Sequence, residues 1–403
     1  MGLGIPGFVP ERLTVARAAR RIASKSALAR RLSVSPSTVA RWEDGASAPD
    51  ENAWDSLASA LDVRREYFLR PAVEIKRALF YRTLSSTLVR DLDYQKAQMH
   101  WLHEISATLQ HYVELPAIDI PDVLGGSSYK QLRDEDLERI ALDLRRHWEM
   151  GEGPCADVVS LLERIGVVVA SIEMGTAKLD GLCSWSEAED RPHILLATDK
   201  MSFARRQMDA AHELAHAVLH REVAKDDLKK DLKEIERQGF RLASAFLMPS
   251  TTFPHEVGRP SLAALLALKE RWRVSVKAQI RRLSDLEMIT ADHAIDLYKL
   301  YSAKGWNREE PFDRQWEIPE PRNLADALNA VIGSGLRTKA DLLAVEFTMA
   351  AGDIENLTNL PAGWFADRGS EVVQLKTEMS RSSLIIEGSG IVVPFSRRSK
   401  SGS

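Results

Sequence analysis

The residues best suited to chemistry are two histidines four positions apart, His212 and His216, with Glu213 directly after the first. On an α-helix, residues i and i+4 share one face, so both imidazoles can reach a single metal ion. The glutamate lies on a neighbouring face, where its carboxylate can take a proton from a metal-activated water. The pattern predicts a hydrolytic zinc centre, and an iron site with two histidines and one carboxylate is the alternative.

A catalytic zinc ion needs a third protein ligand and keeps one coordination position open. The next long helix expected in the sequence offers Glu234 and Glu236. Glu236 shares a helix face with the small residues Gly239 and Ala243, which would allow two antiparallel helices to approach closely. We therefore expect Glu236 to be the third ligand and keep Glu234 as the alternative. Both glutamates could instead belong to the charged run 225–237.

Other residues near this motif have supporting roles in our interpretation. His220 lies four residues beyond His216, and we expect it to support a ligand histidine, because metal-bound imidazoles usually need an outer hydrogen-bond partner. Lining the cleft and polarising a carbonyl is the alternative for His220. Cys183 is expected to be a buried, unreactive thiol rather than a ligand. Segment 192–198 (PHILLAT) is predicted to be an exposed edge strand that holds an extended peptide by strand addition.

These residues need a scaffold of strands and helices. Three short segments rich in β-branched or aromatic residues are predicted to be strands, and two long amphipathic segments after them are predicted to be helices. The strands are 167–172, 181–186 and 193–198, and the helices are 202–220 and 229–247. Helices precede the strands as well, so the order predicts an α+β domain rather than a doubly wound one.

Segment 204–220 (ARRQMDAAHELAHAVLH), followed by 234–249 (EIERQGFRLASAFLMP), resembles the ImmA/IrrE family of metallopeptidases. The sequence departs from the family pattern at Ala215, where glycine is common, and around Gly239 and Phe240. The resemblance covers about residues 131–255 and implies a zincin-like (gluzincin-type) fold.

The resemblance also implies a function for the motif residues. It assigns Zn²⁺ ligands at His212, His216 and Glu236, and a catalytic role to Glu213. Members of the family typically cleave a partner repressor or act beside an antitoxin-like regulator.

The N-terminal part is strongly basic in a chain whose formal net charge is −4. No acidic residue interrupts the stretch from Arg12 to Arg41, which contains these eight cations: Arg12, Arg17, Arg20, Arg21, Lys25, Arg30, Arg31 and Arg41. Such a block indicates contact with a polyanion, although a solvated helical face is the alternative. Ser35 is predicted to be an N-cap, with Pro36 at the first position of the helix that follows.

Residues 11–70 resemble an XRE-type helix-turn-helix domain through the segment SALARRLSVSPSTVARWEDGASAP. In such domains the second helix of the motif lies in the major groove of DNA. The resemblance therefore places four residues at base edges (Ser35, Ser37, Thr38 and Arg41) and three at phosphates (Lys25, Arg30 and Arg31). A helical protein-binding module is the alternative.

The whole chain is expected to be multidomain and mainly α, with an all-α helix-turn-helix at the N-terminus. The predicted parts are a DNA-binding domain (1–70), a helical connector and linker (71–130), the metallopeptidase domain (131–255), a helical domain that resembles a helix-turn-helix (256–320), and a C-terminal region with a disordered tail (321–403). The basic stretch 269–282 within the fourth part could contact DNA, but we favour a solvated face or a docking site for a partner.

Composition excludes several classes of protein. Two cysteines in 403 residues exclude a disulfide-stapled secreted scaffold, and no segment has the apolar length of a signal peptide or membrane helix. We therefore expect a cytoplasmic protein without a membrane partner. No motif indicates ATP, NAD or flavin binding.

Together these features predict a zinc-dependent endopeptidase coupled to a DNA-binding domain. Its substrate would be a repressor or an antitoxin-like regulator in a stress, mobile-element or toxin–antitoxin response, and the chain could form a homodimer on DNA. The alternative is a transcriptional regulator without proteolytic activity, in which the metallopeptidase fold senses a signal or binds a partner.

Overall fold

The computed structural model describes residues 4–73, 75, 77–81, 89–176, 179–199 and 202–366. The elements described below all belong to the unit that ends at Phe365. The predicted disordered tail lies outside the described residues. No helix in the described ranges is long and apolar enough to cross a membrane.

The N-terminal domain consists of short helices, and the side chains of Ser24, Ser35 and Asp50 cap the second, third and fourth of them. The helices are α1 (Pro10–Ala19), α2 (Lys25–Leu32), α3 (Pro36–Glu43), α4 (Glu51–Leu61) and the 3₁₀ helix η1 (Arg65–Leu69). The predicted cap is confirmed, because the Ser35 side chain accepts a hydrogen bond from the Thr38 amide at the start of α3. Ser33 adopts the left-handed conformation between α2 and α3, which turns the chain sharply between these two helices.

Four strands form the sheet, in the order β1-β3-β4-β2. Strands β2 (Val168–Ile172), β3 (Gly181–Ser186) and β4 (Arg191–Ala197) confirm the three predicted strands. Strand β4 pairs antiparallel with β3 on one side and parallel with β2 on the other. The prediction that segment 192–198 is an exposed edge strand is therefore wrong. Ile194 and Leu195 point into cores on opposite faces, so β4 is also covered on both faces.

The connector also differs from the prediction of a mostly helical segment. Only α5 (Val89–Leu109) is a long helix among its described residues, and β1 (Phe80–Tyr81) is a strand. Leu79 and Phe80 are buried in different cores, and only an extended chain sends consecutive side chains to opposite faces.

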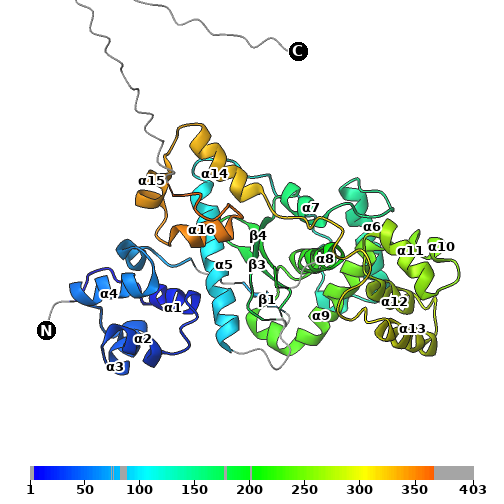
Figure 1. Cartoon of the computed structure of the whole chain (residues 1–403), viewed down its shortest axis with the longest axis horizontal. Coiled ribbons are helices and arrows are strands. Elements are labelled where there is room, and N and C mark those ends of the chain that lie inside the picture. The colour runs from blue at the N-terminus through cyan, green and yellow to red at the C-terminus, as the bar shows by residue number, and fades with distance from the viewer. Residues whose placement is uncertain are drawn as a thin grey trace, which may run out of the picture. The chain divides into compact units, whose positions relative to one another are not determined.

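The sheet separates two layers of helices (Figure 1). One layer contains α6 (Asp134–His147), α7 (Val158–Arg164), α8 (Phe203–Leu219) and α9 (Lys225–Leu247), with the 3₁₀ helix η2 (Tyr129–Gln131) at its margin. The other layer contains α5, which contacts β4 of the sheet, and the core of the N-terminal domain. The predicted multidomain, mainly α fold with a small sheet is confirmed.

Helices α10 (Phe253–Val257), α11 (Leu262–Trp272), α12 (Val276–Asp285) and α13 (Ala291–Ala303) extend the layer that holds α8. Helices α11 and α12 have the turn expected of a helix-turn-helix. Arg273 is left-handed and Ser275 caps α12, as Ser33 and Ser35 do between α2 and α3.

The basic stretch in α11 and α12 is largely engaged within the chain. Lys269 is buried against Glu310 and Asp313, and Arg273 lies over the ring of Trp316. Arg271, Arg281 and Arg282 form ion pairs with Glu256, Asp285 and Glu138 respectively. This stretch therefore supports packing rather than a second surface for DNA.

The C-terminal region gave few signals in the sequence. It contains α14 (Asn323–Gly333), α15 (Lys339–Asp341), the π-helical turn η3 (Leu342–Glu346) and α16 (Ala351–Leu357). It packs on the N-terminal domain, because Arg20 donates two hydrogen bonds to Asp353 (2.7 and 2.6 Å) and Val63 forms a β-bridge with Met349.

Candidate metal centre

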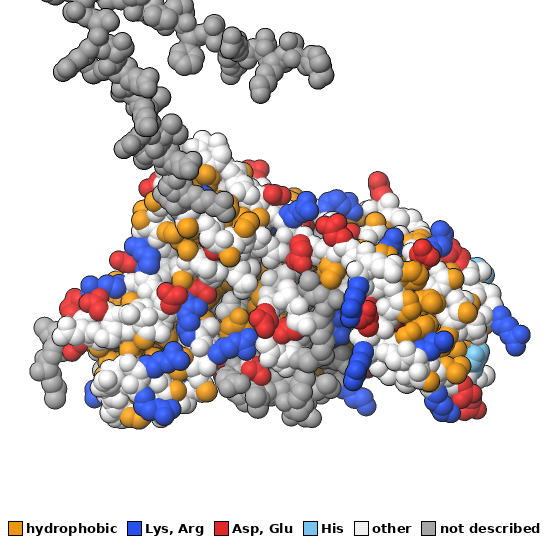
Figure 2. Space-filling model, in the orientation of Figure 1, with side chains coloured by type: hydrophobic (Ala, Val, Ile, Leu, Met, Phe, Trp, Pro, Cys, Tyr) orange, Lys and Arg blue, Asp and Glu red, His pale blue; other side chains and the backbone are white. Residues whose placement is uncertain are grey.

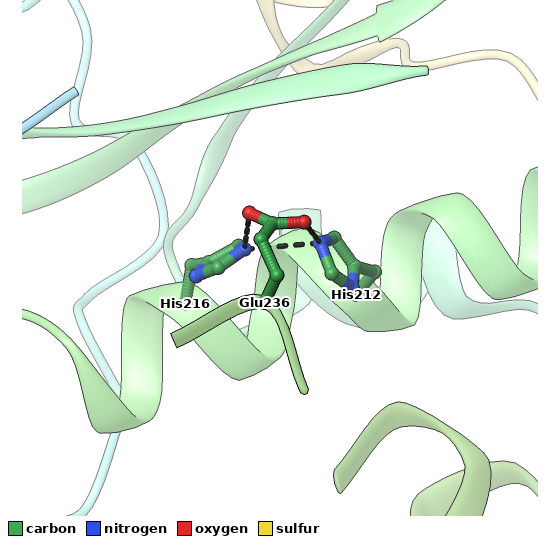
Figure 3. A group of neighbouring side chains, drawn as sticks. All are labelled: His212, His216 and Glu236. Carbon is green, nitrogen blue, oxygen red and sulfur yellow. Dashed lines mark hydrogen bonds and ion pairs between the residues drawn. The ribbon is translucent and has the colours of Figure 1, made fainter. Parts of the chain in front are cut away.

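The two histidines of the motif lie in the C-terminal half of α8, and Glu236 faces them from α9 (Figure 3). The Nε2 atoms of His212 and His216 are 3.0 Å apart, and each is 3.5 Å from an oxygen of Glu236. Tetrahedral ligands about 2.0–2.1 Å from a zinc ion are about 3.3 Å from one another. The spacing of these three side chains therefore fits a zinc ion, and they form the one such cluster among the described residues.

The polar atoms of the cluster also fit a cation. Both carboxylate oxygens of Glu236 are buried without a hydrogen bond, although burial without a partner is costly for a carboxylate. Burial alone would raise the pKa of Glu236, but its contacts with His212 and His216 outweigh burial and lower the pKa. A negative carboxylate that faces two imidazole nitrogens is a donor set that zinc accepts.

Gly239 allows the two helices to approach. A Cβ atom at this position would stand 2.9 Å from Cε1 of His212 and 3.3 Å from Cε1 of His216. The small residue is thus required by the histidines, as the sequence suggested. Glu234, the alternative ligand, instead forms an ion pair with Arg237.

Glu213 lies behind the cluster against the start of β3. Its carboxylate is so close to Gly181 that a Cβ atom there would be 2.5 Å from Oε1. The residue is only 4% exposed, and burial, with the nearby charge of Glu236, raises its pKa well above the usual range. The pKa of Glu213 is therefore raised and that of Glu236 lowered, so of the two carboxylates Glu213 holds a proton more readily.

His220 is the predicted supporting residue, and it lies against His216. Its Nδ1 is 3.0 Å from Nδ1 of His216, and burial together with His216 lowers the pKa of His220 to about 3. Cys183 is fully buried on β3, and burial raises its pKa, as expected of an unreactive thiol.

The sequence reasoning missed several residues of the site. The Phe80 ring stacks on His216 at a centroid distance of 5.0 Å, and the Phe240 ring lies 4.1 Å from His212. Gly181 and Gln238 also went unassigned. Glycine at the first position of a strand is a signal for Gly181, whereas Phe80 is far from the motif in sequence and gives none.

The N-terminal domain presents part of its predicted DNA surface. Ser35, Ser37 and Arg41 are exposed around the start and outer face of α3, and Thr38 is partly exposed. The Ser35 hydroxyl is 2.8 Å from the hydroxyls of both Ser37 and Thr38. Arg30 on α2 is exposed too.

Several cations of the basic block are engaged within the chain. Lys25 pairs with Asp44 at 3.0 Å, and the arginines at 12, 17, 20 and 21 contact acidic residues. Arg31 remains exposed. On the face seen in Figure 2, basic and acidic side chains are interspersed, so no continuous basic surface extends over the described residues there.

The fold and the site define a class: a helix-turn-helix protein that carries a peptidase-type HExxH helix beneath a small sheet. Residues 11–67 match the family model of a helix-turn-helix domain, and residues 162–284 match that of the IrrE N-terminal-like domain of peptidase family M78. The chain therefore joins a helix-turn-helix DNA-binding domain to an ImmA/IrrE-like peptidase domain, which confirms the predicted fusion. No curated protein matches the chain.

Proposed function

We propose that the chain is a zinc-dependent endopeptidase whose centre is formed by His212, His216 and Glu236. The observation that carries the proposal is the convergence of two buried histidines and the partly buried Glu236 at distances of 3.0–3.5 Å, with Glu213 beside them. Bound zinc would supply a Lewis acid that lowers the pKa of a water ligand and polarises a peptide carbonyl.

Glu213 would move the protons of the reaction. Its carboxylate would accept a proton from the attacking water and deliver it to the amine that leaves. Gly181 keeps room for this carboxylate at the start of β3, because any larger residue there would collide with it.

The substrate would be an extended segment of a regulatory protein, such as a repressor or an antitoxin-like partner. The strand nearest the site is β3 rather than β4, because Gly181 at its start lies against Glu213. The next residues of β3, Leu182 and Cys183, pair with β1. A peptide that passes Gly181 in extended form would run over Glu213. The helix-turn-helix would place the peptidase on DNA through Arg41 at bases and Arg30 and Arg31 at phosphates.

The test is cleavage of transcription regulators encoded beside the gene for this chain, each co-expressed with the wild type or with Glu213→Gln. We expect defined fragments with the wild type and none with Glu213→Gln, which keeps all three proposed zinc ligands. Equal fragment patterns from both proteins would refute the catalytic role of Glu213.

The burial of the centre favours one second candidate, a DNA-bound regulator that uses the metal fold as a sensor. His216 is 1% exposed, and Phe80 and Phe240 cover the rings of the two histidines. In this case Glu213→Gln would regulate its operator as the wild type does, whereas loss of the three ligands would abolish regulation.

A further inference from the structure

A continuous series of hydrogen bonds leads away from the metal centre through side chains that the proposed chemistry does not use. Nδ1 of His216 is 3.0 Å from Nδ1 of His220, and Nε2 of His220 is 3.1 Å from Oε1 of Gln238. The Gln238 amide nitrogen donates to the backbone carbonyl of Tyr129 (2.9 Å) and to the carboxylate of Glu234 (3.0 Å).

The far end of this series sets its direction. A backbone carbonyl and a carboxylate can only accept hydrogen bonds, so the amide nitrogen of Gln238 must face them and its oxygen must face His220. That oxygen only accepts, so His220 carries its proton on Nε2 and leaves Nδ1 as an acceptor. His216 must then donate from Nδ1.

The direction of these hydrogen bonds determines which nitrogen of His216 faces the metal centre. A neutral imidazole has one N–H group, so a His216 that is protonated on Nδ1 presents a lone pair on Nε2. That lone pair points to the place where Nε2 of His212 and the carboxylate of Glu236 converge. The hydrogen bonds thus select the tautomer that a zinc ion needs.

We propose that Gln238 is a positioning residue for the metal centre, which acts through His220 to hold His216 in the Nδ1-protonated tautomer and in the ligand orientation. The inference rests on the proposed zinc site. It gives a function to a buried glutamine outside the HExxH motif and to Glu234, which orients the Gln238 amide rather than binding metal.

Packing leaves this arrangement little freedom. Gln238 and His220 are both 0% exposed, so water does not compete for their hydrogen bonds. The Tyr129 ring meets His220 edge-on at 5.6 Å, and Phe80 stacks on His216 on another side.

Two variants of the full-length chain separate the effect of losing the hydrogen-bond acceptor from the effect of disturbing the packing. Gln238→Leu removes the acceptor for His220 while keeping a buried side chain of similar size. Gln207→Leu is the matched control, because Gln207 is also 0% exposed, bonds to the Val158 amide and the Cys155 carbonyl, and lies on α8 outside the series. Zinc affinity is measured by competition with a chromophoric chelator, and thermal unfolding of the zinc-free proteins is recorded in parallel.

We expect Gln238→Leu to bind zinc about 10–100-fold more weakly than the wild type, the usual effect of losing an outer partner of a ligand histidine. Gln207→Leu should lower the unfolding temperature without weakening zinc binding. In histidine-labelled wild type without metal, long-range ¹H–¹⁵N spectra should show Nδ1–H on His216 and Nε2–H on His220.

Zinc affinity of Gln238→Leu within twofold of the wild type would overturn this inference but not the proposed function. The inference would also be wrong if Gln207→Leu lost as much affinity as Gln238→Leu, or if His220 carried its proton on Nδ1. A wild type that binds no zinc would overturn the proposed function and this inference together.

Discussion

Replacing Gly239 by alanine should weaken zinc binding while changing global stability only modestly. The added methyl group would stand 2.9 Å from Cε1 and 3.2 Å from Nδ1 of His212, whereas an ordinary contact is about 3.4–4 Å. Helices α8 and α9 must therefore separate by roughly 0.5–1 Å. Overpacking of this kind costs about 1–3 kcal/mol, and alanine recovers about 1 kcal/mol of helix propensity, so the net loss is about 0–2 kcal/mol.

Zinc binding is more sensitive than folding to this displacement, because ligand distances must hold within about 0.2 Å. Urea unfolding of the zinc-free protein and chelator competition measure the two effects separately. Gly352→Ala is the control, since Gly352 lies in α16 with no atom within 4 Å of the added methyl group, and this variant should bind zinc normally. Unchanged zinc affinity in Gly239→Ala would refute the argument that this glycine fixes the distance between the ligand helices.

Three further changes test other parts of the account. Glu213→Gln should bind zinc but cleave its substrate at least about 100-fold more slowly, because it cannot accept a proton, and cleavage at the wild-type rate would contradict this. Arg41→Ala should weaken operator binding by about 1–3 kcal/mol in titrations at fixed salt, and an unchanged dissociation constant would remove this residue from the interface. His103 is 1% exposed, and burial lowers its pKa from a usual 6.5 to about 3. Between these two pH values the unfolded chain binds more protons than the folded chain, so stability falls as the pH drops from 6.5 toward 3. From pH 7 to pH 5 this histidine costs about 2 kcal/mol. His103→Leu should narrow the difference in unfolding free energy between these two pH values by that amount, and the same difference in both proteins would contradict it.

Much of the centre was predictable because its signals are local. The spacing of His212 and His216 requires only a helix, and the small Gly239 beside Glu236 indicated which acid faces that helix. Both features are present in the structure. The assignment of these side chains to zinc stays a prediction until metal is measured.

The burial of β4 on both faces could have been inferred from its composition. Ile194 and Leu195 are consecutive apolar residues, and a strand with one solvated face alternates instead. The lack of a free edge at β4 follows from its pairing with both β2 and β3, which lie on either side of it in the order of the sheet. The strand at Phe80 was harder to foresee, because its partner Cys183 is about a hundred residues away.

Charge in the N-terminal block was a weaker guide than its count suggested. Arg20 pairs with Asp353, more than three hundred residues later, and Arg12 pairs with Glu104. Local sequence shows neither partner. Counting cations therefore overestimated the basic surface available to DNA.

The zinc content of the purified chain tests the central claim most directly. We expect one zinc ion per wild-type chain and per Glu234→Ala chain, and a large loss of zinc in Glu236→Ala. Equal zinc content in Glu236→Ala and the wild type, or a wild type that takes up no zinc when it is supplied, would contradict the metal centre described above.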